Sequence, residues 1–595
     1  MTVGFWRKYG PYLLMLLAAG VAMRQWRHPG LLCGHSAIMD YERIVVFDEA
    51  VRSGDWWPRF NDVFYYGYGS LLFHFYAPLG YFIAEIFMLA GAGVALSIKL
   101  TWALALVLSG VFMIWLARDL FGDLAAAAAG ALWALAPYRL VDMHVRHAFG
   151  EAIAFAWLPL AMWGLLAAVR DGRFAGLSAA ALGTAALLFT HNIMAMLAAP
   201  VLFAWWLFLA INHRQQGWRG PAYGAAGVAL GALLAAFFWA PAFLEKDLVW
   251  AERSLTTGFF DFHRHFPWFR ELFDPKWTFG DSKPGAADCM PFQLGLAHWI
   301  LLAGLPLAIA ELKRARRPLI FFAAMLAWAL AMCLSISEPL WRLIPTLPFV
   351  QFPWRFLFFA AFAGTLAAAA VVQAAAEIGG SKWLRLVLVP LLALPFIFYF
   401  RCGETRYLLY ARDQRPVYRL VPWSDYQRLL ARGLYERLSD GRTIAWIRQA
   451  YERGTSSDDY LPLEVREKPP GPPAAWIEAE HGLAYYQARQ QPGRYLAKVN
   501  LSRDGVVTLN RYWYPGWRAW VDDVERPTEA AAEIGSIVVR VPAGEHEVRF
   551  AFGPTPLRRG AWAATVVALL LWPGLFFAHR RLSRGAPTPP AAGLG

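Results

Sequence analysis

The chain has 595 residues, of which 58% are hydrophobic and 16% aromatic. This composition excludes an ordinary soluble domain and is typical of a protein that crosses a lipid bilayer many times. The formal net charge of +13 does not indicate a nucleic-acid partner, because the basic residues stand between hydrophobic segments, where membrane topology accounts for them.

The first hydrophobic segment begins at Pro11, shortly after Arg7 and Lys8. No clear small-residue cleavage site follows it, so we expect a retained first helix instead of a signal peptide. The four cysteines, at positions 33, 289, 333 and 402, lack the spacing of a metal site. Three of them fall in segments expected outside the cytoplasm, where a disulfide can form but its pairing cannot be read from the sequence.

Further segments are long and apolar enough to span a bilayer, which takes about 20 residues. Lys and Arg clusters, such as Lys313 to Arg317, fall on alternate loops between these segments. The positive-inside rule therefore places the clusters and both termini in the cytoplasm. About twelve spans are predicted, at 11–27, 95–117, 122–138, 150–169, 174–191, 193–212, 221–243, 292–312, 317–336, 353–374, 384–400 and 560–579.

Residues 71–90 are also apolar enough to span, but counting them would move the Lys313 cluster to the outside. We interpret this segment as a juxtamembrane or re-entrant helix, which is tolerated where protein buries it. Residues 1–400 then form a transmembrane module. Its predicted outer loops are 28–94, 138–150, 244–291 and 336–352.

The chain changes character after residue 400. Residues 401–475 are predicted as an extracytoplasmic, partly helical linker region that ends in the Pro-rich stretch EKPPGPPAAW. Residues 476–559 alternate in the manner of short strands, with AspGly and AlaGly turn signals, and predict a β-sandwich. Residues 560–595 give a final spanning helix and a cytoplasmic tail. The fold class is a mainly α, polytopic membrane protein with a small outer β-sandwich before the last helix.

The first outer loop is unusual because acidic residues follow a membrane helix at once. Asp40 and Glu42 are the candidates for a general base. They cannot share one face of a helix, because they are two residues apart. Arg43 can orient one of them, and an aromatic run that includes Tyr68 follows. The alternative is a solvated loop with interfacial aromatic side chains.

The second outer loop, YRLVDMHVRHAFGE, carries a further polar group. In a helix, His144, His147 and Glu151 would share one face and could hold a divalent metal such as Mg or Mn. The alternative is a polar loop before a helix whose dipole favours Glu151 near its N-terminus. Arg139 and Arg146 suit an anionic ligand better, because guanidinium pairs bidentately with phosphate.

Two more polar pairs stand at the outer ends of predicted spans. His191 and Asn192 join two of them, where a polar residue usually faces the bundle interior or a cavity; a structural histidine is the alternative. Trp354 and Arg355 begin another span, at the depth of a lipid phosphate. Snorkelling of Arg355 to the interface is the alternative reading.

These motifs together resemble the C-type glycosyltransferase superfamily. Within it, the chain is similar to bacterial membrane proteins labelled 6-pyruvoyl-tetrahydropterin-synthase-related, and RYWYPGWRAWVDDVE…VRVPAGEHEVRFAF resembles the end of YfhO-like membrane glycosyltransferases. Related chains often carry an acid after the GlyHis pair, where this sequence has Ser36, so Asp40 and Glu42 both stay open as the base. The matching motifs are GHSAIMDYERI, WWPRF…GYGSLLFHFYAPLGY, YRLVDMHVRHAFGEAIAFAWLP, LFTHNIMA, FQLGLAHW and QFPWRFL.

The resemblance implies a sugar donor on polyprenyl phosphate, an acceptor hydroxyl on a lipid, glycan or protein, and a place in the bacterial cytoplasmic membrane. It implies catalytic roles for Asp40, Glu42 and Glu151. The donor phosphate would bind Arg355, Arg146 and Arg139. The substrate cavity would be lined by Arg43, Tyr68, Tyr138, His144, His191, Asn192 and Trp354.

Two other classes of function stay open. A flippase or transporter of polyprenyl-linked glycans should show paired repeats and broken helices near the midplane. A non-catalytic assembly protein would use the β-sandwich to recruit a partner. Substitution of Asp40 and Glu42 separates these hypotheses, because an assembly protein should keep its function.

Overall fold

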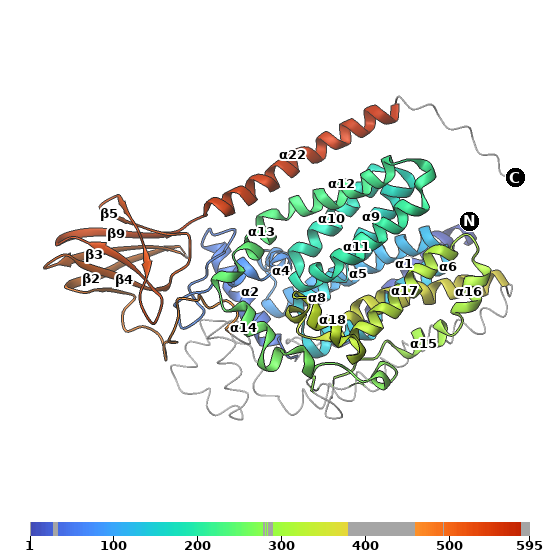
Figure 1. Ribbon diagram of the computed structural model, residues 1–595, viewed down its shortest axis with the longest axis horizontal. Coiled ribbons are helices and arrows are strands. Elements are labelled where there is room, and N and C mark those ends of the chain that lie inside the picture. Colours follow the sequence, from blue (N-terminus) through green and yellow to red (C-terminus); the bar gives the residue numbers. More distant parts are fainter. Residues whose placement is uncertain are drawn as a thin grey trace.

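The computed structural model describes residues 2–27, 34–275, 277, 280, 282–283, 290–378, 458–491 and 493–584. It consists of a helical body with a β-sandwich at one end and one long helix, α22 (Pro556–Arg584), along its side (Figure 1). The predicted span 384–400, the linker region up to residue 457 and three of the four cysteines lie outside the described residues. The remaining cysteine, Cys333, is a buried free thiol.

Seven described helices are long and apolar enough to cross a membrane, and each matches a predicted span. An eighth is formed by α12 (Arg219–Leu234) and α13 (Ala236–Leu244), which are bent by 72° at their junction. The chain is therefore a multi-pass membrane protein. The seven helices are Val94–Phe121, Asp123–Arg146, Phe149–Asp171, Asn192–Asn212, Arg316–Cys333, Pro353–Ile378 and Pro556–Phe577.

The other described segments that were expected to be helical are shorter or broken. The segment 174–191 becomes α10 (Phe174–Thr190), with 17 residues. The segment 292–312 is divided into α15 (Leu296–Leu302) and α16 (Leu305–Glu311) by a break at Gly304, before a proline that favours a new helix start. The first helix, α1, covers Thr2–Ala22. Residues 71–90 form α3 (Leu72–Phe75) and the 11-residue α4 (Leu79–Leu89), which is too short to cross a bilayer.

Glycines let the helices of the body approach closely. A Cβ atom at Gly164 of α9 (Trp157–Asp171) would lie 2.2 Å from the backbone nitrogen of Ala180 in α10. A Cβ atom at Gly183 would lie 2.6 Å from the nitrogen of Ala161. Small residues at such crossings are the usual means of packing helices in a membrane.

The β-sandwich consists of two antiparallel sheets, with strand orders β1-β4-β8-β7 and β2-β3-β9-β5-β6. Buried and exposed positions alternate along β3 and β5, so that apolar side chains such as Val499, Trp517 and Phe550 fill the space between the sheets. The strands are β1 (Ile477–Ala479), β2 (Gly482–Gln491), β3 (Arg494–Leu501), β4 (Gly505–Tyr512), β5 (Trp517–Val521), β6 (Val524–Arg526), β7 (Glu529–Ala530), β8 (Ser536–Val541) and β9 (Gly544–Phe552).

The β-sandwich rests on the first outer loop. The Tyr495 hydroxyl donates a hydrogen bond to Asp62 Oδ2 at 2.8 Å, and the backbone N–H of Tyr512 donates to the carbonyl of Tyr68 at 2.7 Å. The Tyr68 ring also stacks on Tyr512, with 5.3 Å between ring centroids. The two parts of the chain therefore form one continuous structure.

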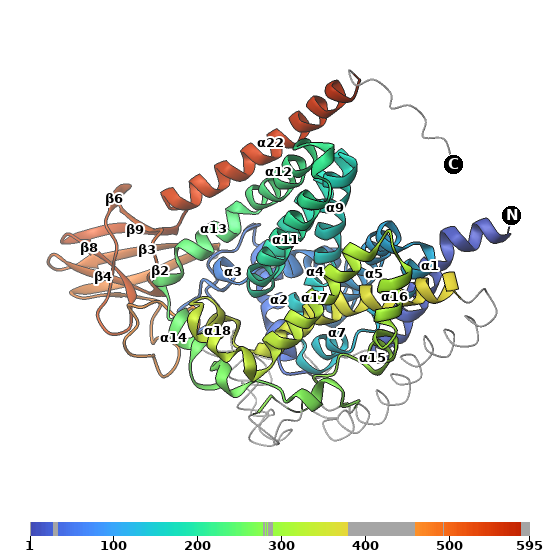
Figure 2. The same ribbon diagram turned by 45° about the vertical axis from the view of Figure 1, so that its right-hand side comes forward.

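A buried polar cluster joins the last helix to the first outer loop. Glu245, just after α13, accepts a hydrogen bond from Arg558 of α22 at 3.0 Å, and its carboxylate lies 2.6 Å from Nε2 of His74. Arg59 contacts the other nitrogen of His74 at 2.8 Å. Figure 2 shows α22 lying along α12 and α13 after this contact.

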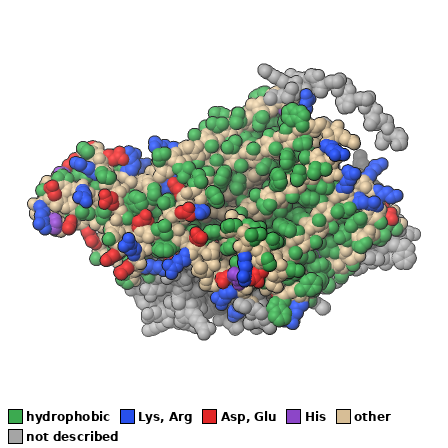
Figure 3. Space-filling view, in the orientation of Figure 1, with side chains coloured by type: hydrophobic (Ala, Val, Ile, Leu, Met, Phe, Trp, Pro, Cys, Tyr) green, Lys and Arg blue, Asp and Glu red, His purple; other side chains and the backbone are tan. Residues whose placement is uncertain are grey.

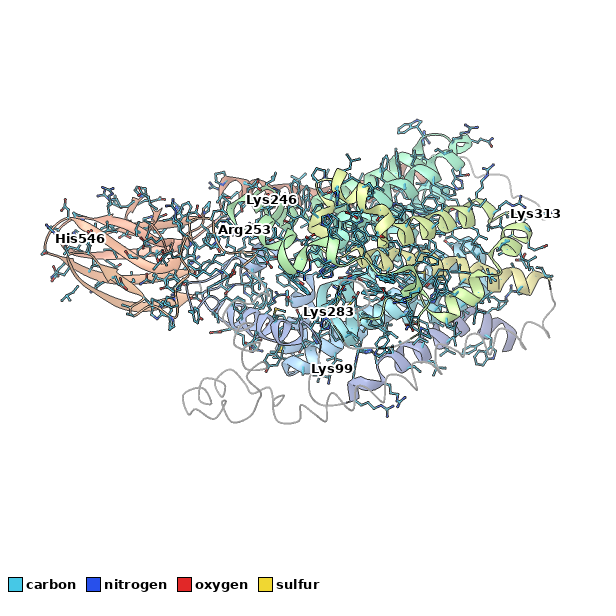
Figure 4. The ribbon with its side chains drawn as sticks, turned by 60° about the horizontal axis from the view of Figure 1, so that its bottom comes forward. Lys99, Lys246, Arg253, Lys283, Lys313 and His546 are labelled. Carbon is cyan, nitrogen blue, oxygen red and sulfur yellow. The ribbon has the colours of Figure 1, made fainter. Side chains whose placement is uncertain are left out.

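The surface separates into apolar and charged regions. Figure 3 shows hydrophobic side chains over the helical body and charged side chains on the β-sandwich. Lys313 lies at the end of the molecule opposite His546 of the β-sandwich (Figure 4). An apolar belt between two polar ends is the arrangement that a bilayer requires.

Candidate active site

The first and second outer loops are hydrogen-bonded to each other. The backbone N–H groups of His35 and Ser36 donate to the carbonyls of Val145 and Arg146, both at 3.0 Å. Gly34 allows the contact, because a Cβ atom there would lie 2.7 Å from the Cβ of His147. The motifs GHSAIMD and DMHVRHAF, more than 100 residues apart in sequence, thus form one structure.

Asp40 lies at the centre of this contact, in the first turn of α2 (Ala37–Arg52). It is only 1% exposed. His147 Nδ1 lies 3.0 Å from Asp40 Oδ2, and the Arg43 guanidinium lies 3.8 Å from Oδ1. Both oxygens of the carboxylate are therefore oriented by neighbouring groups of positive or hydrogen-donating character.

Glu42 has a different environment from Asp40. It is buried, and it makes no hydrogen bond or ion pair with any residue that the structure describes. Burial raises the pKa of Glu42 to about 7. Asp40 is thus oriented by charged and polar partners, whereas Glu42 is buried and binds its proton more tightly. Both acids stay candidates for the base.

A second group of charges lies at the outer ends of three spans. Glu151 accepts a hydrogen bond from the Tyr138 hydroxyl at 2.5 Å, and it forms ion pairs with Arg146 at 2.9 Å and with Arg355 at 3.3 Å. Arg146 also pairs with Asp142. Glu151 and Asp142 are fully buried, so their charges are neutralised by these arginines and not by water.

Arg355 is also fixed by hydrogen bonds to the turn that precedes it. Its Nη1 donates to the carbonyl of Val350 at 2.7 Å and to the Gln351 side chain at 2.9 Å. Arg146 lies over the ring of Trp354, 4.5 Å from its centroid. Two guanidinium groups from separate helices thus converge on Glu151.

Tyr76 connects the two groups. The Arg43 guanidinium lies 4.6 Å from the Tyr76 ring centroid and 3.5 Å from the Tyr81 hydroxyl. Burial raises the pKa of Tyr76, and the nearby guanidiniums of Arg43 and Arg355 act against that effect. Tyr76 and Tyr81 were not predicted as site residues, although both belong to the motif FHFYAPLGY.

His191 and Asn192 hold the helices around the site. His191 Nδ1 accepts from the backbone N–H of Met194 at 3.2 Å and so caps α11 (Asn192–Asn212). Asn192 donates to the carbonyl of Phe75 at 2.6 Å. The contact of Asn192 with Phe75 ties the start of α11 to the segment that carries Tyr76.

Three predicted site residues lie apart from these groups. Arg139 points to α5 (Val94–Phe121), where it donates to Ser109 at 2.5 Å. His144 accepts from the Trp26 indole at 3.0 Å. Tyr68 lies against the β-sandwich, as described above. These contacts account for the three side chains, and their predicted roles in binding substrate stay predictions.

The predicted metal ligands do not share a helix face. The helix ends at Arg146, and His147 has a left-handed backbone with φ of 54°. Consequently each side chain has a different partner. His144 contacts Trp26, His147 contacts Asp40, and Glu151 contacts the two arginines. Within the part of the chain that the structure describes, no three His, Cys, Asp or Glu side chains are arranged to hold a metal ion.

Comparisons with known proteins give distant matches. No family model matches the sequence. An uncharacterized protein from Lactococcus lactis subsp. cremoris (strain MG1363) is 24% identical over 278 residues, which cover 45% of this chain and 44% of that protein. The chain thus matches less than half the length of this curated relative.

Among solved structures, the chain is similar to the archaeal oligosaccharyltransferase AglB from Archaeoglobus fulgidus, in complex with an inhibitory peptide and a dolichol-phosphate. The two chains are 18% identical with a TM-score of 0.40, and the match covers 68% of this chain and 56% of AglB. The arabinofuranosyltransferase AftD from Mycobacteria is 15% identical with a TM-score of 0.42, covering 66% and 26%.

ArnT from Cupriavidus metallidurans, bound to undecaprenyl phosphate, is 16% identical with a TM-score of 0.30, covering 70% of this chain and 90% of that one. The similarity to YfhO-like proteins stays a prediction from the sequence. All three matches to solved structures have TM-scores below 0.5, and the C-type glycosyltransferase superfamily stays a resemblance seen in the sequence.

Proposed function

We propose that the chain is an integral membrane glycosyltransferase that moves a sugar from a polyprenyl-phosphate-linked donor to a hydroxyl group of an extracytoplasmic acceptor. The observation that carries this proposal is the convergence of an oriented carboxylate, Asp40, with a pair of guanidinium groups, Arg146 and Arg355, at the outer ends of several spans. Tyr76 packs against Arg43 and is within electrostatic reach of both Asp40 and Arg355.

The guanidinium pair suits a lipid-linked phosphate. Arg146 and Arg355 both contact Glu151, and the structure describes no other carboxylate that they share. A phosphate oxygen can take hydrogen bonds from both in the bidentate manner that guanidinium favours. Their position at the ends of spans matches the depth of a phosphate whose polyprenyl tail lies in the bilayer.

The carboxylate side supplies the proton acceptor. In the proposed reaction the acceptor hydroxyl oxygen attacks the anomeric carbon of the sugar, and the bond from that carbon to the phosphate oxygen breaks. The hydroxyl proton moves to Asp40, and polyprenyl phosphate leaves with the electron pair of the broken bond. One direct displacement inverts the sugar configuration. The Asp40–His147 contact keeps the carboxylate in place.

The test of this proposal is turnover after Asp40→Asn. We expect turnover to fall by about 10²–10⁴, the range for loss of a general base, in transfer from radiolabelled undecaprenyl-phosphate sugars. Asp48→Asn is the matched control, since Asp48 lies on the same helix and pairs with Arg52 near the surface at 2.7 Å. Near-normal turnover after Asp40→Asn moves the assignment to Glu42, and near-normal turnover after the double substitution ends the proposed mechanism.

A flippase is the second candidate, because α12 and α13 form a broken helix bent by 72°. From the break, α13 leads to Glu245, which contacts His74 and Arg558 and, within the described residues, forms no hydrogen bond or ion pair with the two charge groups of the site. A flippase would move fluorescent polyprenyl phosphates across proteoliposomes without any acceptor, and this activity would survive Asp40→Asn.

A further inference from the structure

Asp459 is a buried acid from the segment that leads into the β-sandwich. It is 7% exposed, and its Oδ1 atom has no hydrogen-bond partner among the residues that the structure describes. Burial raises the pKa of Asp459 to about 7, and the nearby Arg43 guanidinium acts against this rise. Asp459 therefore lies within electrostatic reach of the arginine that also faces Asp40.

Contacts on both sides fix the position of this segment. The Tyr460 ring stacks on Phe75 with 5.6 Å between centroids and 3° between planes, and the Tyr514 hydroxyl donates to the Tyr460 carbonyl at 2.6 Å. The backbone N–H of Trp250 donates to the carbonyl of Leu461 at 3.0 Å. Phe75 directly precedes Tyr76, so these contacts place Asp459 beside the site.

The neighbouring acid, Asp458, differs in having an ionic partner, although its Oδ1 atom is also buried without a hydrogen-bond partner in the described part of the chain. Asp458 forms an ion pair with Lys468, and both side chains are partly exposed, at 22% and 51%. An ordinary surface turn would leave both acids in water. Here Asp458 is paired at the surface, whereas Asp459 is buried and forms no ion pair with any described residue.

We propose that Asp459 binds a hydroxyl group of the acceptor, so that the segment before the β-sandwich forms one wall of the acceptor site. This inference rests on the proposed glycosyltransferase function. A carboxylate repels the donor phosphate but accepts hydrogen bonds from hydroxyl groups. Arg43 then stabilises the charge of both carboxylates. Asp40 takes the proton of the acceptor hydroxyl, and Asp459 binds the acceptor. Asp459 is thereby an acceptor-binding residue and not a further base.

The experiment compares Asp459→Asn with Asp458→Asn in the purified full-length protein. Donor and acceptor are varied separately, with a radiolabelled undecaprenyl-phosphate sugar as donor and a glycolipid extract of bacterial membranes as acceptor. Asp459→Asn is expected to raise the KM for the acceptor about 10- to 100-fold, the effect of losing a charged hydrogen-bond partner. The KM for the donor should stay within about twofold. Asp458→Asn should leave both values unchanged.

Binding of undecaprenyl phosphate, measured by native mass spectrometry, separates the two hypotheses. Wild-type protein that binds this lipid and transfers sugar supports the function; Asp459→Asn kinetics like those of Asp458→Asn would then overturn only the role of Asp459. An increase in the donor KM alone would place the hydroxyl on the donor sugar and overturn the acceptor assignment. Wild-type protein that neither binds nor transfers refutes the function and this inference with it.

Discussion

At the scale of single residues, His147 shows how one backbone conformation positions a side chain. Its φ of 54° lies in the left-handed region, which residues other than glycine seldom adopt. This turn stops the helix that ends at Arg146 and brings the ring within 3.0 Å of Asp40. Such local strain is often found where a functional side chain must be placed.

Arg355 gives the first prediction at this scale. We expect Arg355→Ala to raise the donor KM about 10- to 100-fold with a smaller effect on turnover, because one charge-assisted contact to the phosphate, worth about 1.5–3 kcal/mol, is lost. The matched control is Arg342→Ala, whose side chain is 66% exposed and pairs with Glu338 at the surface. An unchanged donor KM in a reconstituted assay would contradict a phosphate contact at Arg355.

Glu42 gives a pH dependence. Its pKa is raised from 4.5 to about 7, so between these values the unfolded chain releases its proton before the folded protein does. The free energy of unfolding therefore falls as the pH rises through this window, by an amount on the order of 3 kcal/mol, and is level above it.

Glu42→Gln removes this loss, because glutamine does not ionise. We expect the variant and the wild type to unfold at the same temperature near pH 4 and the variant to unfold at the higher temperature near pH 8. Thermal unfolding in detergent, followed from pH 4 to pH 8, measures the difference. A variant less stable than the wild type at pH 8 would show that Glu42 ionises with a favourable partner.

At the scale of elements, close helix packing decides the shape of the body. Gly164→Val should destabilise the protein by about 1–3 kcal/mol, because the new side chain meets the Ala180 backbone and the helices must separate. Gly560→Ala in α22 is the control, since nothing lies within 4 Å of a Cβ atom there. Equal unfolding temperatures of the two variants would mean that α9 and α10 are not tightly packed.

The elements also show what could be read from the sequence. Hydropathy predicted all seven of the described helices that are long enough to span, because a run of about 20 apolar residues fits few structures other than a membrane-spanning helix. It could not predict the break at Gly304 or the bend after Leu234, since a broken helix keeps its apolar composition.

Site residues divide in the same way. The sequence placed Arg146, Glu151 and Arg355 on one side of the membrane, and the structure brings them together; their roles stay predictions. The sequence could not reveal that the Arg139 side chain points toward Ser109, because the direction of a side chain depends on the packing around it. Asp459 had no signal either, since only long-range contacts bring it to Arg43.

At the scale of the whole molecule, the arrangement of charge predicts topology. Both termini and the Lys313 cluster should be cytoplasmic, and the β-sandwich should be outside. In a variant without native cysteines, Ser502→Cys should react with an impermeant maleimide on intact cells, whereas Arg314→Cys should react only after permeabilisation. Both positions are exposed. The reverse labelling pattern would show that the membrane topology is opposite to the predicted one, with the proposed site on the cytoplasmic side.

The contact between Glu245 and Arg558 also sets an order on biosynthesis. The ribosome makes Glu245 more than 300 residues before Arg558. During that interval Glu245 has the His74 ring and the more distant Arg59 guanidinium near it, but not the arginine with which it pairs. A buried carboxylate without its cation is strongly unfavourable. We therefore expect the contact between the first outer loop and the end of α13 to become fully stable only after the last helix is in place.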